Sequence, residues 1–410
     1  MTVTANNMQK KNLLIIGAGI FQTYAIRVAK RMGLSVCVID QDANAPGIRL
    51  ADHHMIASTR DISQAIRCAR RFRNRYGLDG VFTCGTDVSH TVASVAEALD
   101  LPGIPPETAL MATDKGLMRT ALKKAGVPVP DFRIVQSLSQ ALEAARQIGF
   151  PLVIKPVDNM GARGVRKCRS RKELETAWSE TSRHSRTQRI ILESFIPARE
   201  LSIDTLVDRG RIHLLTIADR IISGSPFFIE RGHTIPSMQP PGELQAAFAM
   251  AKKGIRALNI RTGASKFDMR LSKNGPIIGE MTARLSGGFH SQLTDPLATG
   301  MNSIKAAIDL CLGNPLDVKD ITPRFHRHAC ERSLYPRPGR ITAINGIEKA
   351  KQMKNIADII INIKIGDLLH PLNSNIGKAG HVIGYGSTRA EAVKCTLDAV
   401  RAIHIRTQTP

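Results

Sequence analysis

Short apolar runs alternate with amphipathic stretches over the first 110 residues of the chain. Three such runs predict strands: 13–17, 35–40 and 80–85. Residues 22–32 and 89–99 predict helices that follow them. Strands that alternate with helices are typical of a parallel sheet covered by helices on both faces. We therefore expect an α/β domain that ends near the Pro/Gly-rich joint at 101–106.

The middle of the chain predicts an α+β arrangement instead of a regular alternation. Helices are expected over residues 113–125, 137–149 and 243–258. Strands are expected over 150–156 and 189–196, and hairpins over 201–217 and 265–281. After about residue 324 the chain is strand-rich, and it closes on a helix expected over 389–402.

A glycine-containing loop follows a strand that carries a lysine. Lys155 lies near the end of the apolar run 150–156, where a half-buried lysine needs an anionic partner. Gly161 and Gly164 in the next segment, 158–165, let backbone N–H groups face an anion without a side-chain clash. The Gly-Lys-Ser/Thr of a P-loop is absent from this segment. We predict that the loop and Lys155 bind phosphate together.

Other polar positions are suited to a nucleotide. Ser194 and Ile196 follow Glu193 at the end of a predicted strand, where backbone groups are suited to pair with a purine. Glu200 is suited to accept hydrogen bonds from ribose hydroxyls. Lys115 begins a predicted helix, where an exposed lysine is the ordinary expectation.

Two carboxylates lie on consecutive strands of the second hairpin. A three-residue loop that ends at Gly275 would pair Ser272 with Pro276 and place Asp268 opposite Glu280. A two-residue turn would place the carboxylates on opposite faces. We expect the three-residue loop, because glycine readily takes the left-handed conformation of its last position. Two carboxylates on one face repel unless a cation lies between them, and we expect Mg²⁺, with Mn²⁺ as a substitute.

An arginine and a compact glycine loop follow the hairpin. Arg284 lies four residues after Glu280, and Ser286-Gly287-Gly288 comes next. Arginine is suited to bind a carboxylate or the oxygens of a phosphoryl group in transfer. A surface ion-pair cluster is the alternative interpretation.

Taken in order, these residues resemble the motifs of the ATP-grasp superfamily. The resemblance rests on Lys115, Lys155, the loop 158–165, Glu193, Glu200, Asp268, Glu280 and Arg284. It implies a Rossmann-like N-terminal domain over 12–110, and an ATP-grasp domain of two α+β subdomains over 111–312. The lid subdomain would span about 127–198, and a small, strand-rich C-terminal α+β subdomain 313–410.

The resemblance also implies roles for these residues. The ATP-binding residues would be Lys115, Lys155, Gly161, Gly164, Glu193, Ser194, Ile196 and Glu200. Asp268 and Glu280 would hold Mg²⁺. The family often has asparagine two positions after the second carboxylate, where this chain has Thr282. Because a hydroxyl is a poorer ligand than an amide oxygen, we expect either a weaker metal site or bidentate binding by Glu280.

Two later segments, 225–237 and 339–392, resemble bacterial L-amino-acid ligases. In that family the residues matching Glu230 and His233 line the amino-acid pocket, and Arg284 would hold an acyl-phosphate intermediate. Arg284 and Lys155 are therefore the expected catalytic residues.

The resemblance implies an ATP-dependent ligase that activates a carboxylate as an acyl phosphate, releases ADP and joins the carboxylate to an amine. The first alternative is an ATP-grasp enzyme of purine-type carboxylation or formyl transfer, because residues 51–54 and their surroundings also resemble those enzymes. The second is a non-catalytic, basic nucleotide- or nucleic-acid-binding protein.

The charge of the chain favours this second alternative, but the aromatic content does not. Lys and Arg number 57 against 35 Asp and Glu, which gives a net charge of +22. Only one Trp and four Tyr are present for base stacking. We expect ATP, a small carboxylate and an amine as partners, and no nucleic acid. The seven scattered cysteines and the lack of a membrane-length apolar run suggest a cytoplasmic protein without membrane contact. A homodimer is compatible with the sequence.

Overall fold

The N-terminal part of the computed structural model, which describes residues 10–408, is a four-stranded parallel sheet in the order β3-β2-β1-β4. Its strands are β1 (Asn12–Ile16), β2 (Ser35–Asp40), β3 (His53–Ile56) and β4 (Gly80–Phe82). Its helices are α1 (Ile20–Arg31), α2 (Ile62–Tyr76) and α3 (Ser89–Glu97). In β1, Leu13 and Ile15 pack in one core cluster, whereas Leu14 and Ile16 pack in another. Both faces of the sheet are therefore covered, and the predicted α/β domain is confirmed.

The strand predicted over 80–85 ends early, at Phe82. Beyond it, Cys84 forms a parallel bridge with Leu285, and the Gly85 amide donates to the Leu285 carbonyl at 3.3 Å. The chain therefore leaves the N-terminal sheet here and pairs with the loop that follows Arg284. This contact brings the N-terminal domain to the edge of the site described below.

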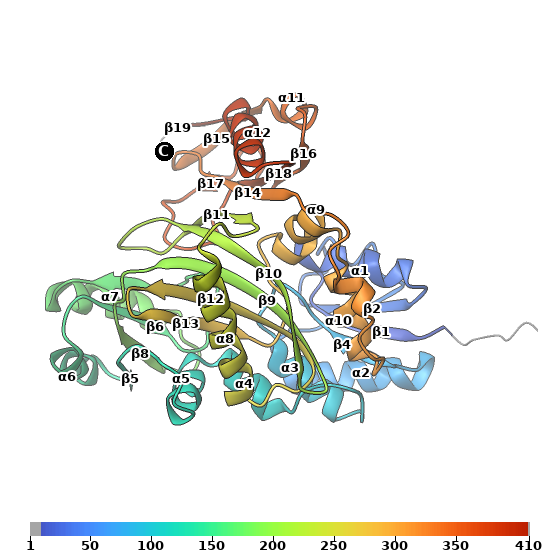
Figure 1. The fold of residues 1–410 in the computed structure, drawn as a ribbon, viewed down its shortest axis with the longest axis horizontal. Coiled ribbons are helices and arrows are strands. Elements are labelled where there is room, and N and C mark those ends of the chain that lie inside the picture. Colours follow the sequence, from blue (N-terminus) through green and yellow to red (C-terminus); the bar gives the residue numbers. More distant parts are fainter. Residues whose placement is uncertain (1–9, 409–410) are drawn as a thin grey trace, which may run out of the picture.

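A second, antiparallel sheet in the order β5-β8-β6-β7, named the lid after the subdomain predicted there, lies beside the rest of the molecule (Figure 1, green, at the left). Its strands are β5 (Phe132–Val135), β6 (Leu152–Pro156), β7 (Arg166–Cys168) and β8 (Ile190–Ser194). Helices α6 (Leu138–Ile148) and α7 (Arg171–Arg183) pack on it.

The helix predicted over 113–125 is confirmed over most of its length, but a second helix that was not predicted precedes it. The structure has two helices there, α4 (Pro106–Thr113) and α5 (Lys115–Lys124). Asp114 separates them in an extended conformation, and its side chain accepts the Leu117 amide at 2.8 Å, which caps α5. The cap fixes Lys115 as the first residue of α5.

The largest sheet has eight strands in the order β13-β12-β9-β10-β11-β14-β18-β16. Its first five strands along the chain are β9 (Arg199–Asp208), β10 (Arg211–Ile222), β11 (Glu230–Ile235), β12 (Gly263–Ser272) and β13 (Gly275–Thr282). Helix α8 (Pro241–Ala257) packs on β12 and β13, with buried residues in the same core cluster.

The C-terminal part shares this large sheet. It contributes β14 (His328–Leu334), β16 (Ile356–Ile361) and β18 (Gly380–Gly386), and β14 pairs with β11. A separate sheet contains β15 (Gly339–Asn345), β17 (Leu368–Leu369) and β19 (His404–Gln408), with α11 (Ile347–Lys351) and α12 (Arg389–Ala402) nearby (Figure 1, orange to red). Strand β19 was not predicted: the helix over 389–402 was expected to be the last element of the chain. The domain boundaries given above stay a prediction.

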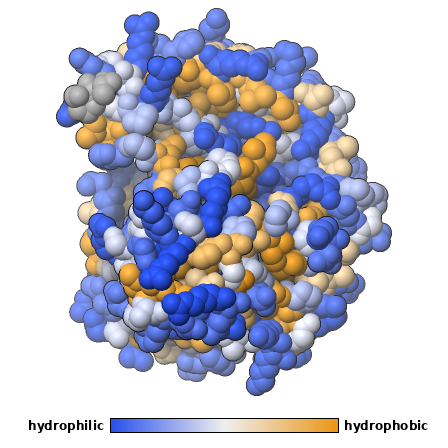
Figure 2. Space-filling model, turned by 90° about the vertical axis from the view of Figure 1, so that its left-hand side faces the viewer, coloured by the Kyte–Doolittle hydropathy of each residue, from blue (hydrophilic) through white to orange (hydrophobic). Residues whose placement is uncertain are grey.

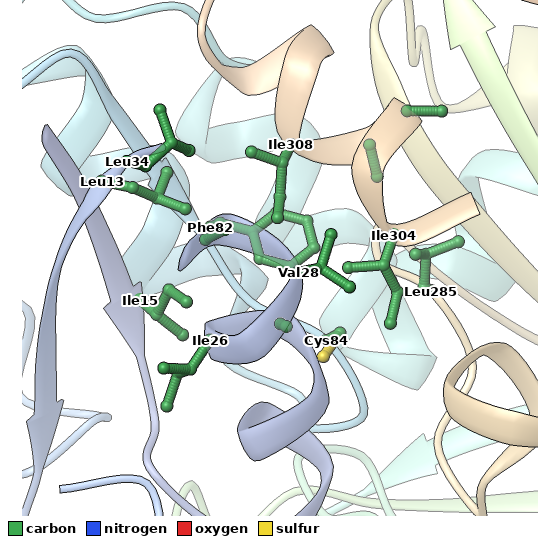
Figure 3. Close-up of a cluster of buried hydrophobic side chains, with 14 of the residues drawn as sticks. Leu13, Ile15, Ile26, Val28, Leu34, Phe82, Cys84, Leu285, Ile304 and Ile308 are labelled. Atoms are coloured by element: carbon green, nitrogen blue, oxygen red, sulfur yellow. The ribbon is translucent and has the colours of Figure 1, made fainter. Parts of the chain in front are cut away.

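A core cluster joins the N-terminal sheet to the middle of the chain. Between β13 and β14 lie a π-helix (His290–Thr294), α9 (Asp295–Thr299), α10 (Ser303–Cys311) and a 3₁₀-helix (Val318–Ile321). Figure 3 shows Ile304 and Ile308 of α10 beside Phe82 of β4 and Leu285. This packing holds the N-terminal domain against the loop that carries Arg284.

The surface on the lid side is mostly hydrophilic, with hydrophobic patches between the polar side chains (Figure 2). Ile365, Ile376 and Met238 are among the most exposed apolar side chains, with exposed fractions of 64%, 61% and 62%. Among the described residues, no helix is both long and apolar enough to cross a membrane.

The core cluster gives a stability prediction. Ile308 of α10 is fully buried where this helix packs against the N-terminal sheet. Ile308→Ala leaves a cavity there, and we expect it to lower the free energy of unfolding by about 2–5 kcal/mol. Ile365→Ala, at an exposed position, should change it by less than about 0.5 kcal/mol. Urea unfolding followed by circular dichroism measures both, and an equal effect of the two variants would contradict this account of the core.

Candidate active site

One cavity of about 340 Å³ lies where the lid, the large sheet, the N-terminal domain and the C-terminal part meet. Eleven predicted site residues line it: Lys115, Lys155, Gly161, Glu193, Ser194, Glu200, Glu230, His233, Asp268, Glu280 and Arg284. They come from α5, β6, β8, β9, β11, β12, β13 and the loops after β6 and β13. The fold thus gathers positions that are up to 169 residues apart, from 115 to 284.

Two predicted ATP-binding residues do not line this cavity. Gly164 packs behind the loop, where a Cβ would lie 3.0 Å from the Cβ of His184, and its carbonyl accepts the Thr181 hydroxyl at 2.9 Å. Ile196 lies in a neighbouring pocket, and its carbonyl accepts from Arg270 at 3.4 Å. Gly164 therefore fixes the loop by packing, while Gly161 faces the cavity.

The two hairpin carboxylates face each other, but by a different route from the predicted one. The turn contains two residues, since Ser272 pairs with Gly275, so the predicted pairing of Ser272 with Pro276 is wrong. A one-residue bulge after Ile278 then shifts the register, and Asp268 pairs directly with Glu280. The bulge compensates for the shorter turn, which alone would have placed the carboxylates on opposite faces.

Gly279 and a buried arginine hold this bulge. A Cβ on Gly279 would lie 2.9 Å from the Asp268 carbonyl oxygen, so the close approach requires glycine. The guanidinium of Arg119 donates to the carbonyls of Ile278 at 2.9 Å and Gly279 at 2.6 Å. Arg119 is fully buried, and it was missed by the sequence analysis. The sequence did contain a sign of this role, because Arg119 lies one helical turn after Lys115 and among the apolar positions of an amphipathic helix.

Arg119 also binds one of the predicted nucleotide residues. Its Nε lies 2.7 Å from Glu193 Oε1, and Lys155 Nζ lies 2.6 Å from Glu193 Oε2. Burial raises the pKa of Glu193, but Arg119 and Lys155 outweigh it and bring this pKa to about 2. Burial lowers the pKa of Lys155 to about 8, against the opposing effect of Glu193. Near neutral pH Glu193 is thus ionised and Lys155 is charged.

Lys115 links the hairpin that carries Glu280 to the loop 158–165. Its Nζ lies 2.8 Å from Glu280 Oε1 and donates to the Asn159 carbonyl at 2.6 Å. Burial lowers the pKa of Lys115, but the charge of Glu280 outweighs it and leaves the pKa above its usual value. Burial raises the pKa of Glu280, but the charges of Lys115 and Lys266 outweigh this effect and hold the pKa well below its usual range. The alternative expectation, that Lys115 is an exposed helix residue, is wrong, because the exposed fraction of Lys115 is only 7%.

A second arginine, Arg220 of β10, joins three carboxylates. It lies 3.0 Å from Glu200, 3.1 Å from Glu230 and 2.9 Å from Asp268. Arg270 contacts the other oxygen of Glu200 at 3.1 Å. The sequence analysis missed Arg220, although a charged residue in the strand-forming run 212–222 was a usable signal.

The residues of the hairpin fit a hard cation. Asp268 pairs with Arg220 and Lys266, and Glu280 pairs with Lys115. Thr282 Oγ1 is buried, lines the same cavity and has no hydrogen-bond partner among the described residues. An unpaired buried hydroxyl two residues after Glu280 is free to coordinate a cation beside the two carboxylates. Over residues 10–408, no group of three or more His, Cys, Asp or Glu side chains provides a metal site by itself.

The glycine loop after Arg284 is fixed from two sides. Arg284 donates to Asp87 of the N-terminal domain at 2.8 Å through Nε. The Ser286 hydroxyl donates to the buried Asp204 carboxylate at 2.6 Å. Phe289 then takes a left-handed conformation (φ 65°) at the start of the π-helix, a strained geometry that is frequent at functional sites. The loop residues Gly287 and Gly288 are thereby held at the wall of the cavity.

His233 is a poor candidate for a general base. Burial lowers its pKa to about 3, with a further contribution from His290, whose ring stacks on it with 5.2 Å between centroids. Its Nε2 lies 2.7 Å from the Thr294 hydroxyl. His233 is therefore neutral at physiological pH and suited to hydrogen bonding.

Three family models match separate parts of the chain. The ATP-grasp N-terminal domain matches residues 26–103, the ATP-grasp domain matches 148–292, and the L-amino acid ligase C-terminal domain 2 matches 332–408. The matches follow one another in the order predicted from the sequence.

Individual proteins agree with these models. The crystal structure of an L-amino acid ligase from Bacillus licheniformis superposes with a TM-score of 0.85 at 26% identity, over 98% of this chain and 100% of that one. A protein of Sinorhizobium fredii described as uncharacterised is 25% identical over 98% of this chain and 84% of its own length. A formate-dependent phosphoribosylglycinamide formyltransferase of Rhodococcus jostii is 27% identical, but over only 45% of this chain and 46% of its own length.

Fold, cavity and family matches together define the class of the protein. It is an ATP-grasp enzyme, an ATP-dependent ligase that forms C–N bonds between a carboxylate and an amine. Within that class it resembles the L-amino acid ligases, in the ATP-grasp core and in the C-terminal part.

The buried lysine of β6 gives a pH prediction. Because burial lowers the pKa of Lys155 to about 8, its positive charge is present below that pH and is lost above it. We expect kcat/KM for ATP to fall about tenfold per pH unit above pH 8. In Lys155→Arg the guanidinium stays charged, so this alkaline decline should disappear whatever the absolute rate. ADP release measured from pH 6 to pH 10 checks this, and an unchanged profile in the variant would assign the decline to another group.

Proposed function

We propose that the protein joins two amino-acid-like substrates, activating the carboxylate of one and linking it to the amine of the other. The observation that carries the proposal is the cavity itself. It extends from the glycine loop at Gly161 to Lys378 and His381 of the segment that matches L-amino acid ligases. Its lining therefore suits a nucleotide together with small polar substrates.

In the first step, an oxygen of the substrate carboxylate attacks the γ-phosphorus of ATP, and the bond to the β-phosphate oxygen breaks, which yields an acyl phosphate and ADP. Little covalent chemistry is needed from the protein, so positioning and charge neutralisation supply the catalysis. Lys115 and Lys155 are suited to bind the phosphates, and Arg284 to stabilise the acyl phosphate. We infer that Glu193, with Ser194, binds adenine, and that Glu200 binds the ribose.

We infer that Mg²⁺ binds at Asp268 and Glu280, with Thr282 as the third oxygen ligand. When bound, such an ion neutralises phosphate charge and polarises the phosphoryl group. Mn²⁺ has similar ligand preferences and would substitute. The pairing of Asp268 with Glu280 across the hairpin and the unpaired Thr282 hydroxyl support this assignment.

In the second step, the amine attacks the acyl carbon and phosphate leaves, so that an amide forms. Glu230 is suited to orient the attacking amine and not to accept its proton, which the departing phosphate can take up. Burial acts against its ionisation, but Arg220 and Lys378 hold its pKa well below the usual range. It is therefore a carboxylate that can orient an ammonium group, while His233 contributes a hydrogen bond.

Carboxylation or formyl transfer of the purine type is the alternative, and its support is narrower. A formyltransferase of Wolinella succinogenes is 25% identical over 76% of this chain, but the family model that matches residues 332–408 is that of the L-amino acid ligases. A cytoplasmic location and a homodimer stay predictions.

Hydroxylamine provides the direct test of the function. It traps an acyl phosphate as a hydroxamate, so the assay needs only ATP, Mg²⁺ and a carboxylate. We expect hydroxamate and ADP in equal amounts with at least one of the twenty standard amino acids. Hydroxamate from formate, or turnover with bicarbonate instead of amino acids, would favour the purine-type alternative.

Glu280 gives a prediction for the metal site. Glu280→Gln keeps a hydrogen-bond acceptor for Lys115 but removes the charge that would bind Mg²⁺. We expect Mg²⁺-dependent ADP release to fall by at least about 100-fold. The melting temperature serves as the control for folding. Unchanged turnover in the folded variant would refute the metal assignment.

Thr282 gives a matched pair of variants. Thr282→Val removes the hydroxyl at nearly constant shape, whereas Thr282→Asn supplies an amide oxygen. We expect the Mg²⁺ concentration for half-maximal ADP release to rise several-fold in the first and to fall several-fold in the second. If both variants match the wild type, Thr282 is not a ligand.

A further inference from the structure

Among the residues that the structure describes, the cavity contains one buried cation without an ionic partner. Eight Lys and Arg side chains line it, and seven of them pair with carboxylates: Lys115, Arg119, Lys155, Arg220, Lys266, Arg270 and Arg284. The eighth, Lys378, forms no ion pair within residues 10–408, although its exposed fraction is only 9%. A buried ammonium group without a partner is costly, so its position calls for an anion that comes from outside the chain.

Lys378 is held in place by its backbone neighbours. The next residue, Ala379, donates its amide to the Leu334 carbonyl at 3.2 Å, and β18 begins immediately afterwards. Three residues before Lys378, the backbone N–H of Asn375 donates to the Gly161 carbonyl at 2.8 Å. The side-chain oxygen of Asn375 accepts a hydrogen bond from the backbone N–H of Glu230 at 2.8 Å. The segment that carries Lys378 therefore bridges the nucleotide loop and the predicted amino-acid pocket.

The buried acids near Lys378 already have partners of their own. Glu331 binds the His381 Nδ1 at 2.7 Å and the Ser333 hydroxyl at 2.8 Å. Glu230 is paired with Arg220 at 3.1 Å. Lys378 affects both acids from a distance, since its charge contributes to the lowered pKa values of Glu230 and Glu331. Its three donors are therefore left for a ligand.

We propose that Lys378 binds the non-reacting carboxylate of the amine substrate, which makes it a determinant of specificity for amino acids over simple amines. The inference rests on the proposed function and adds a residue to it. A charged hydrogen bond to a carboxylate is strong inside a cavity that excludes water. The ionised Glu230 and the charged Lys378 together match the opposite charges of a free amino acid.

The cations suited to the nucleotide lie elsewhere in the cavity. Lys155 of the lid pairs with Glu193, and Lys115 of α5 donates to the Asn159 carbonyl in the loop 158–165. Lys378 comes from the C-terminal part, next to β18. The segment that carries Lys378 also binds the Glu230 amide through Asn375, so we assign Lys378 to a substrate carboxylate and not to an ATP phosphate.

Two kinds of amine test the assignment with the full-length protein. One is hydroxylamine, which has no carboxylate. The other is a matched pair, the best amine substrate among the twenty standard amino acids and its carboxamide. In Lys378→Met, we expect the ratio of kcat/KM for the amino acid to that for its carboxamide to fall on the order of 30-fold. Hydroxamate formation and the KM for ATP in the hydroxylamine assay should stay within about twofold of the wild type.

Control variants separate charge from folding. Lys378→Arg keeps the positive charge and should retain most of the preference for the amino acid. Lys364→Met removes an exposed lysine of the same C-terminal part and should behave as the wild type. Melting temperatures of all three variants report whether each is folded, and Lys378→Arg still tests the charge if Lys378→Met is unstable.

The outcomes distinguish the two levels of inference. An equal loss with the amino acid and its carboxamide, or a raised KM for ATP with hydroxylamine, overturns the role of Lys378 while the ligase function stands. If the wild-type protein forms no hydroxamate with any amino acid, the proposed function fails, and the assignment of Lys378 fails with it.

Discussion

The buried guanidinium of Arg119 is the contact on which the geometry of the site depends. One side of it binds Glu193 of the lid, and the other binds the carbonyls of Ile278 and Gly279 in the bulged strand. Its helix α5 begins with Lys115, which pairs with Glu280. A single buried side chain thus ties the lid to the hairpin that carries Asp268 and Glu280. Without it, Glu193 would lose a partner in a place where an unpaired charge is costly.

The same principle governs the rest of the cavity. Buried charged side chains lie beside charges of the opposite sign. One chain of ion pairs runs from Lys155 through Glu193 to Arg119, and another group surrounds Arg220. Such networks hold side chains in fixed positions, because each group loses its partner if it moves. They also keep acids ionised and lysines charged before any substrate arrives. The site is therefore organised for a highly charged ligand such as ATP, and the unpaired Lys378 stands out against this background.

Much of the fold was predictable, because its signals are local. The β1 and β2 strands, the helix α12 and the order of the site residues along the chain follow from periodicity and motif spacing. Errors arose where one part of the chain decides the structure of another. Strand β4 is short because the following residues pair with Leu285, some 200 positions later, and β19 forms because β15 is available as its partner. Local sequence contains no record of either partner.

For the site, the sequence by itself determined the chemical inventory: lysines for phosphate, carboxylates for a cation, and glycines where backbone must approach closely. Tertiary structure decided how these groups meet. Asp268 faces Glu280 through a two-residue turn and a compensating bulge, a combination that pattern alone does not distinguish from a three-residue loop. Arg119 and Arg220 gained their roles only from partners distant in sequence, and His233 lost its basicity through burial. Residue types follow from sequence, whereas burial, register and the identity of each charge's partner depend on the packed molecule.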